Sequence, residues 1–357
     1  MILVLIVILA TLVFTYTNGF HDTANSIATV VSTKVLTPRQ AILLATVFNL
    51  VGALAGTAVA TTVGKGMVDA GYINMTTILC GLVGAIGWNL LTWYYGIPSS
   101  SSQALIGGLI GSALASSRGN LQVVTWASGS GHWWQRGGVI YKVIIPMITS
   151  PLVGLIVGFI IMGLLYFILR NWRPITVARV FGKLQLLSAS YMGFAHGTND
   201  AQKTMGIIAL ALFTATNAGR LDNLPSWAQF LHTPKFTVAL WVQLLCGVTM
   251  AIGTAAGGWR IIRTLGHKMV KLQPVHGFAA ETTGATILAV TAYFGMPVST
   301  THAVTASIMG VGAAKRLSAL KLTVVERILW AWVLTLPATG GIGYGLVRLA
   351  QTCSWVP

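Results

Sequence analysis

Acidic residues are scarce in this 357-residue chain: six Asp and Glu stand against 22 Lys and Arg, and charged residues make up only 8% of it. Hydrophobic residues make up 55%. A soluble domain of this length cannot cover its surface with so few charges, so the composition predicts a polytopic protein in a lipid bilayer. In a soluble protein the basic excess would suggest nucleic acid, but here it lies mostly in short loops, where it signals membrane topology. No nucleic-acid partner is expected.

Cysteine is rare as well. The three cysteines, Cys80, Cys246 and Cys353, lie far apart and fit neither a metal-binding motif nor a disulfide pattern. No serine or cysteine stands beside a recognisable base, which argues against an enzyme. We expect no cofactor.

Three of the six acidic residues fall inside apolar runs: Asp22, Asp200 and Glu281. An ionised carboxylate in the hydrocarbon region costs roughly 2.5–3.5 kcal/mol even on a lenient scale, so each predicts a partner, a cavity or a function. Asn18, Asp22, Asn25 and Thr29 have the spacing of one helix face. A structural polar seam between helices is the alternative interpretation.

The segment around Asp200 repeats the segment around Asp22, half a chain later. The pairs matched at an offset of 178 positions are Gly19 with Gly197, Asp22 with Asp200, and Ser26 with Thr204. Two acidic motifs in apolar surroundings indicate a duplicated fold with a site where the halves meet.

We therefore expect an all-α polytopic membrane protein with two inverted repeats, broken helices and two re-entrant hairpins, about 10–12 membrane segments in all. Residues 1–138 form the first repeat, 139–183 a connecting transmembrane helix and basic cytoplasmic loop, and 184–357 the second repeat. The predicted helices cover 2–33 (interrupted at Asn18-Gly19), 40–62, 76–95, 139–169, 236–258, 275–294 and 328–350, with a cytoplasmic surface helix at 260–271. The first run has no basic segment before it and no clear cleavage site, so a mature helix is expected there and not a signal peptide.

The loops 170–183, 260–271 and 315–327 each hold four Lys or Arg. Basic loops of this kind stay on the cytoplasmic side, which places the N-terminus outside and predicts a multi-pass protein of the plasma membrane.

Two Pro-broken segments match each other at an offset of 199. Each presents polar side chains at the start of a short helix: Ser100, Ser101, Ser102 and Gln103 in the first, Ser299, Thr300, Thr301 and His302 in the second. Free N–H groups, the positive end of the helix dipole and hydroxyl donors together predict an oxyanion site. Ordinary N-capping is the alternative, but it explains only one hydroxyl at each tip.

Neither tip carries Lys or Arg, so anion binding would depend on N–H and O–H donors, Lys203 and bound cations. The nearby carboxylates would repel a bare polyanion unless they are protonated or neutralised. Cation and anion would then stabilise each other's binding, which is itself a coupling mechanism.

These motifs carry a family resemblance. The sequences NGFHDTAN, HGTNDAQKTMG, GIPSSSSQ and GMPVSTTHA resemble, in order and over nearly the whole chain, the duplicated motifs of the PiT inorganic phosphate transporters. The resemblance implies a secondary transporter with phosphate between the hairpin tips and coupling cations at the Asp motifs. It also implies a homodimer and an elevator-like movement.

The sequence departs from the sodium-coupled members of that family at two positions. The first Asn of the usual motif is His21 in one copy, and the last Asn is Lys203 in the other. The ammonium of Lys203 can replace one bound sodium, which favours proton coupling as in similar bacterial permeases. A purely structural salt bridge with Asp200 is the alternative. The predicted coupling residues are Asp22, Asn25, Asn199, Asp200, Lys203 and Glu281, and any remaining sodium would lie at Asp22, Asn25 and Asp200.

Glu281 has no acidic counterpart, because its match at the offset of 199 is Leu82. This asymmetry makes it the first candidate for a proton carrier, and His302 is the second.

Four alternatives stay open. A sulfate permease of the same fold would present the same hydroxyls, and sodium-coupled phosphate symport would use the same acids. The substrate can also be a neutral metal–phosphate complex. From another class, an anion channel would line its pore with these motifs.

Overall fold

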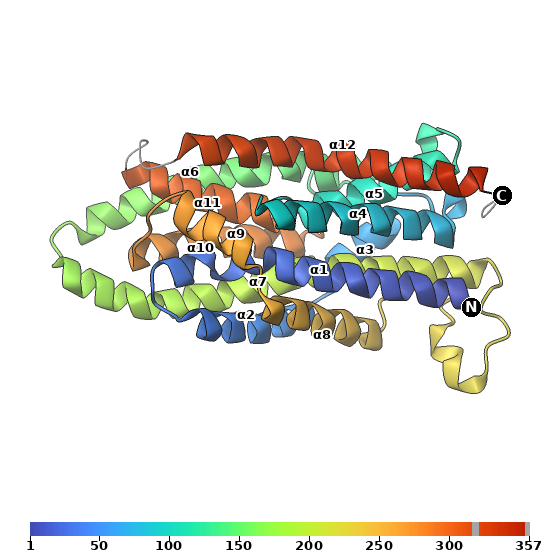
Figure 1. Ribbon diagram of the computed structural model, residues 1–357, viewed down its shortest axis with the longest axis horizontal. Helices are drawn as coiled ribbons and strands as arrows, with labels where there is room; N and C mark the ends of the chain where they lie inside the picture. Colours follow the sequence, from blue (N-terminus) through green and yellow to red (C-terminus); the bar gives the residue numbers. More distant parts are fainter. Residues whose placement is uncertain (316–320, 354–357) are drawn as a thin grey trace.

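The computed structural model describes residues 1–315 and 321–353, with the backbone alone at residues 70, 267 and 268. These residues form a bundle of α-helices without strands, which confirms the all-α prediction (Figure 1). The helices are α1 (Ile2–Ser32), α2 (Pro38–Ala53), α3 (Ala58–Lys65), α4 (Met75–Tyr95), α5 (Ser101–Ser116), α6 (Ile145–Leu169), α7 (Pro174–Asn217), α8 (Leu240–Ala256), α9 (Trp259–Arg263), α10 (Pro274–Tyr293), α11 (Thr300–Lys315) and α12 (Leu322–Thr352).

The outside of the bundle is strongly apolar. Leu187 and Val333, for example, are 68% and 66% exposed. By length and composition, α1, α4, α12 and α6 with the π turn before it can each cross a membrane. The pairs α2–α3 and α8–α9, bent by 69° and 59°, meet the same criterion as broken spans. Apolar surface on this scale fits the multi-pass membrane protein that the composition predicts.

The two Pro-broken hairpins have the predicted boundaries. Helix α4 starts after Asn74, whose side chain accepts from the N–H of Thr77, and it ends just before Gly96. Helix α10 ends at Tyr293, two residues before Gly295. Gly96 and Gly295 have φ of 64° and 62°, a region that side chains with a Cβ avoid. A proline two residues later prevents either helix from continuing.

Two predicted helix boundaries are wrong. Helix α1 continues through Asn18-Gly19, and a Cβ on Gly19 would lie 2.6 Å from the carbonyl oxygen of Met250. The glycine therefore permits close packing against α8 and does not break α1. The helix predicted over 40–62 is the bent pair α2–α3.

The surface helix predicted over 260–271 is also wrong. Helix α9 has five residues and continues as a π turn, Thr264–Lys268. Ile261, Ile262 and Leu265 are buried and pack in one cluster with Ala24 and Ile27 of α1. The side chains of His267 and Lys268, and residues 316–320 of the third predicted basic loop, lie outside the described residues.

Matching elements of the two halves run in opposite directions (Figure 1). Helix α1 starts at the end of the bundle that holds both termini, whereas α7 runs toward that end. The α4–α5 hairpin enters from the terminus-bearing end, and the α10–α11 hairpin enters from the other. Their tips touch, since Ser102 Oγ donates to the carbonyl of Val298 at 3.2 Å.

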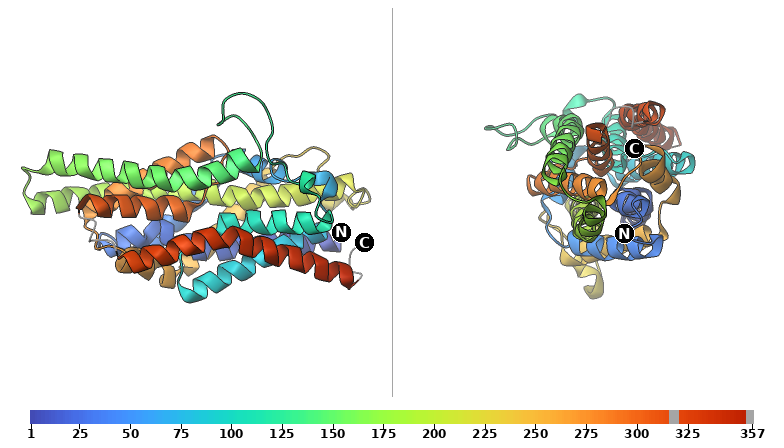
Figure 2. Two further views of the ribbon diagram at one scale, coloured as in Figure 1. Left: turned by 90° about the horizontal axis from the view of Figure 1, so that it is seen from above. Right: turned by 90° about the vertical axis from the view of Figure 1, so that its left-hand side faces the viewer.

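The basic connection between α6 and α7 lies at the end opposite both termini, where these two helices project beyond their neighbours (Figure 2). The boundary predicted between residues 183 and 184 lies inside α7, a continuous 44-residue helix.

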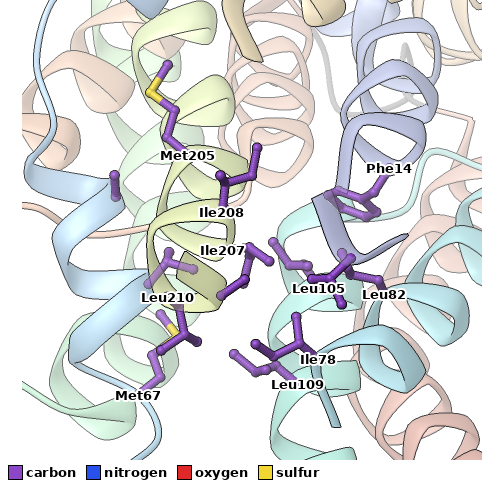
Figure 3. Packing of buried hydrophobic residues seen from close by; sticks show 14 of the residues in the cluster. Phe14, Met67, Ile78, Leu82, Leu105, Leu109, Met205, Ile207, Ile208 and Leu210 are labelled. Carbon is purple, nitrogen blue, oxygen red and sulfur yellow. The ribbon is translucent and has the colours of Figure 1, made fainter. Parts of the chain in front are cut away.

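An apolar core supports the hairpin tips on the terminus-bearing side. Figure 3 shows side chains of α7 facing those of α4 and α5, with Phe14 of α1 beside them. Its labelled members are Phe14, Met67, Ile78, Leu82, Leu105, Leu109, Met205, Ile207, Ile208 and Leu210. This packing fixes α1, α7 and the first hairpin relative to one another.

Candidate functional site

The two acidic motifs meet where α1 and α7 pack together. Asp22 and Asp200 are 2% and 1% exposed, and oxygen atoms of both lie within 4.8 Å of a ring nitrogen of His196 and of each other. Asp22 Oδ1 lies 2.6 Å from His21 Nδ1, and Asp22 Oδ2 is buried without a hydrogen-bond partner among the described residues. The predicted meeting of the two copies is therefore present.

Lys203 connects the second motif to both hairpin tips. Its ammonium donates to Asp200 Oδ1 at 2.5 Å, to the hydroxyl of Ser102 in the first tip, and to the carbonyl of Val298 in the second at 2.9 Å. All three N–H donors are thus used, and the side chain is 2% exposed. A cation that lies between the two tips supplies the positive charge that the tips themselves lack.

The second tip also contacts both motifs through its hydroxyls. Thr300 donates to Asp200 Oδ2 at 3.2 Å. Asn25 of the first motif donates to Thr300 Oγ1 at 3.2 Å and to Thr301 Oγ1 at 3.0 Å. Three elements distant in sequence thereby form one hydrogen-bonded cluster.

One serine at each tip is a helix cap. Ser100 Oγ accepts from the N–H of Gln103 at 3.1 Å, and Ser299 Oγ accepts from the N–H of His302 at 3.2 Å. Capping accounts for these two hydroxyls. It does not account for Ser101, whose hydroxyl is buried without a partner among the described residues.

The tips contain further side chains that point elsewhere. Gln103 and His302 line a separate cavity of about 400 Å³ between α6, α11 and α12. The imidazole of His302 stacks on Trp332, with the ring centroids 4.0 Å apart. Neither side chain bonds to the Asp–Lys cluster in the described part of the chain, and their role in phosphate binding stays a prediction.

Glu281 occupies a second polar site. Its carboxylate accepts from Thr29 at 2.6 Å, from Gln185 at 2.9 Å and from the hydroxyl of Ser188. Thr29 lies seven residues beyond Asp22, about 10 Å along α1. Glu281, which belongs to α10, therefore contacts the same face of α1 that carries Asp22, about two helical turns away from it. No Lys or Arg pairs with it among the residues described.

Unpartnered polar groups concentrate around the Asp–Lys cluster. Asp22 Oδ2, Ser26 Oγ and both amide atoms of Asn199 are buried without hydrogen-bond partners in the described ranges. Buried polar groups normally have partners, so such a concentration is typical of a site for a polar ligand, ions or water. Hydroxyl and N–H donors beside a lysine suit an oxyanion, and the carboxylates suit a cation.

Three supporting polar residues were not predicted from the sequence: Asn49, Thr92 and Thr254. His196 Nδ1 lies 3.0 Å from Asn49 Oδ1, and Asn49 donates to Thr254 Oγ1 at 3.2 Å. His21 Nε2 lies 3.1 Å from the hydroxyl of Thr92. An amide inside an apolar run, as at Asn49, was the available signal.

Comparison with known proteins identifies the relatives of this chain. Residues 18–343 match the model of the phosphate transporter family. A protein of Bacillus subtilis (strain 168) named "Probable low-affinity inorganic phosphate transporter" is 41% identical over 345 residues, covering 96% of both chains. A Rhizobium meliloti (strain 1021) protein of the same name is 42% identical over 328 residues, 92% of this chain and 90% of that one. A solved structure described as "The sodium-dependent phosphate transporter" has the same fold, with a TM-score of 0.81 over 99% of this chain and 100% of its own, at 22% identity.

Proposed function

The chain belongs to the phosphate transporter family, and we propose that it imports inorganic phosphate together with protons. It does so as a multi-pass protein of the plasma membrane, by alternating access with an elevator-like movement of its hairpins. The observation that carries the proposal is the ammonium of Lys203, held between Asp200 and both hairpin tips.

Lys203 supports proton coupling by its position. The carboxylate of Asp200, which would otherwise need a bound cation, is already paired with a fixed one at 2.5 Å. The ammonium is part of the Lys203 side chain and cannot be released as an ion on the other side of the membrane. This position therefore contributes no transported sodium. The charge that accompanies phosphate must then come from other groups.

Glu281 supports proton coupling by its surroundings. Three neutral donors hold its carboxylate, and no cationic side chain pairs with it among the described residues. A proton is therefore the simplest counter-charge at this buried group. His302 is the second candidate carrier.

The helix directions support inverted repeats. The first motif and hairpin run opposite to the second motif and hairpin, as expected for two halves related by an axis in the membrane plane. The basic residues of the α6–α7 connection lie opposite the termini, which supports a cytoplasmic position for that end and an external N-terminus. A homodimer stays a prediction from the family resemblance.

A metal–phosphate complex is the second candidate substrate, and one observation favours it. A ring nitrogen of His196 and carboxylate oxygens of Asp22 and Asp200 lie within 4.8 Å of one another, and nitrogen and oxygen ligands of this kind suit a divalent cation. A metal in this cluster would neutralise the carboxylates and bind phosphate directly.

Phosphate selectivity can be tested in proteoliposomes with radiolabelled phosphate. Thr300→Val removes a hydroxyl that bonds to Asp200 and should raise the KM for phosphate at least about tenfold. Thr286→Val is the matched control, because this exposed hydroxyl bonds only to the carbonyl of Thr282 in its own helix. Unlabelled phosphate should compete and sulfate should not, because phosphate can donate a hydrogen bond to a carboxylate and sulfate cannot. Competition by sulfate, or an equal effect of both variants, would contradict the proposal.

A further inference from the structure

The end of helix α4 is held by a cationic side chain from α9. Arg260 Nη1 donates to the carbonyl of Tyr94 at 2.5 Å, and the guanidinium lies 5.1 Å from the ring centroid of Trp93. Thr264 donates to the carbonyl of Gly96 at 2.9 Å. Carbonyls at a helix C-terminus have no partner within the helix and form its negative dipole end, so a cation stabilises them.

The end of helix α10 is held in a chemically similar way by a different element. Lys142, in the π turn Ile140–Ile144 before α6, donates to the carbonyl of Phe294 at 2.8 Å and to that of Trp134 at 3.0 Å. A cavity of about 550 Å³ adjoins this contact, lined by Lys142, Phe294, Gly295 and residues of α3.

The two contacts lie on opposite sides of the hairpin tips. The hairpins enter from opposite ends of the bundle (Figure 1). The C-terminus of α4 therefore faces the end that holds the basic α6–α7 connection, called the basic-loop end below, and the C-terminus of α10 faces the end that holds both termini. The side chains between them are nearly inaccessible: Ser101, Thr300 and Lys203 are 1–2% exposed. With both contacts formed, the central site is closed from either side.

We propose that Lys142 and Arg260 are positioning residues that close the two sides of the central site. Release of Lys142 from Phe294 frees the second hairpin and opens the terminus-bearing side. Release of Arg260 from Tyr94 frees the first hairpin and opens the basic-loop side. This inference rests on the proposed transport function, since only a carrier needs access from each side in turn.

Side-specific thiol labelling tests this directly. The reporter is Val298→Cys in a chain whose native cysteines are replaced. The Val298 side chain is apolar and 2% exposed, and only its backbone oxygen bonds to Lys203. A membrane-impermeant methanethiosulfonate is applied separately to right-side-out and inside-out vesicles, without phosphate or an ion gradient.

Lys142→Met should raise the labelling rate from the terminus-bearing side at least about tenfold, the factor expected for loss of one charged hydrogen bond. Arg260→Met should raise it by a similar factor from the basic-loop side. Lys142→Arg should restore slow labelling, because a guanidinium can also donate to two carbonyls. The controls are Lys235→Met and Arg263→Met, which remove exposed charges without hydrogen bonds in the described residues.

An increase from both sides in either variant, no increase, or an equal increase in the controls would overturn the proposal. Failure of Lys142→Arg to restore slow labelling would also overturn it, because it would indicate general loosening of the fold. The readout is independent of substrate. Side-specific labelling without phosphate uptake would count against the proposed function alone, and normal uptake with unchanged labelling would count against these two residues alone.

Discussion

Replacing Lys203 by asparagine should convert this protein from sodium-insensitive to sodium-stabilised. In the structure, the ammonium of Lys203 neutralises Asp200 and bonds to both hairpin tips. Lys203→Asn removes that charge and supplies an amide oxygen, as in the motif of the sodium-coupled transporters that this sequence resembles. Asp200 then retains Thr300 and His196 as neighbours, and a sodium ion can take the place of the ammonium.

The magnitude follows from the pair that is broken. Removing one partner of a buried ion pair typically destabilises a protein by about 3–5 kcal/mol. Sodium at 100 times its dissociation constant would recover about 2.7 kcal/mol. At roughly 2 °C per kcal/mol for a large chain, this corresponds to a rise in Tm of about 5 °C.

The assay is thermal unfolding of the purified protein in detergent, in sodium chloride and in choline chloride at equal ionic strength. We expect no sodium-dependent shift for the native chain and the shift above for Lys203→Asn. Lys203→Met is the control: it should lower Tm without any response to sodium, because it supplies no oxygen ligand. A sodium response in the native chain, or none in Lys203→Asn, would refute the reasoning.

Three further predictions concern other parts of the fold. Glu281→Gln keeps the shape of the side chain and removes its proton exchange, so uptake driven by a pH gradient should stop while phosphate–phosphate exchange across proteoliposomes continues. Gly197→Ala should lower the free energy of unfolding by about 1–3 kcal/mol, because the added Cβ would lie 2.7 Å from Cα of Asn49. Gly182→Ala in the same helix is the control for thermal unfolding: its added Cβ has no atom within 4 Å and should not destabilise the protein. Gly96→Ala should cost about 1–2 kcal/mol because of its φ of 64°, and a normal Tm would contradict that cost.

The parts of the fold that depend on local chemistry could be predicted from the sequence. A glycine followed two residues later by proline ends α4 and α10 whatever surrounds them, and the serine two residues after each proline caps the next helix. Lys203 stands three residues after Asp200, and residues at this spacing are neighbours on one face of a helix. The sequence therefore predicts the ion pair between the two side chains that the structure contains.

Features that depend on distant segments could not be predicted. Gly19 signals a helix break and close helix packing equally well, and only the approach of α8 selects packing. The sequence match of Gln103 with His302 does not reveal that both side chains line a cavity beside α6 and α12. The contacts of Lys203 with Ser102 and Val298 bring together residues about a hundred positions apart, and no periodicity encodes them.

The most direct test of the central claim is phosphate uptake into proteoliposomes under one gradient at a time. A proton gradient in sodium-free buffer should drive accumulation of radiolabelled phosphate, and an inward sodium gradient at equal pH on both sides should not. Accumulation that requires sodium would contradict proton coupling and would assign the Asp22 and Asp200 motifs to sodium binding.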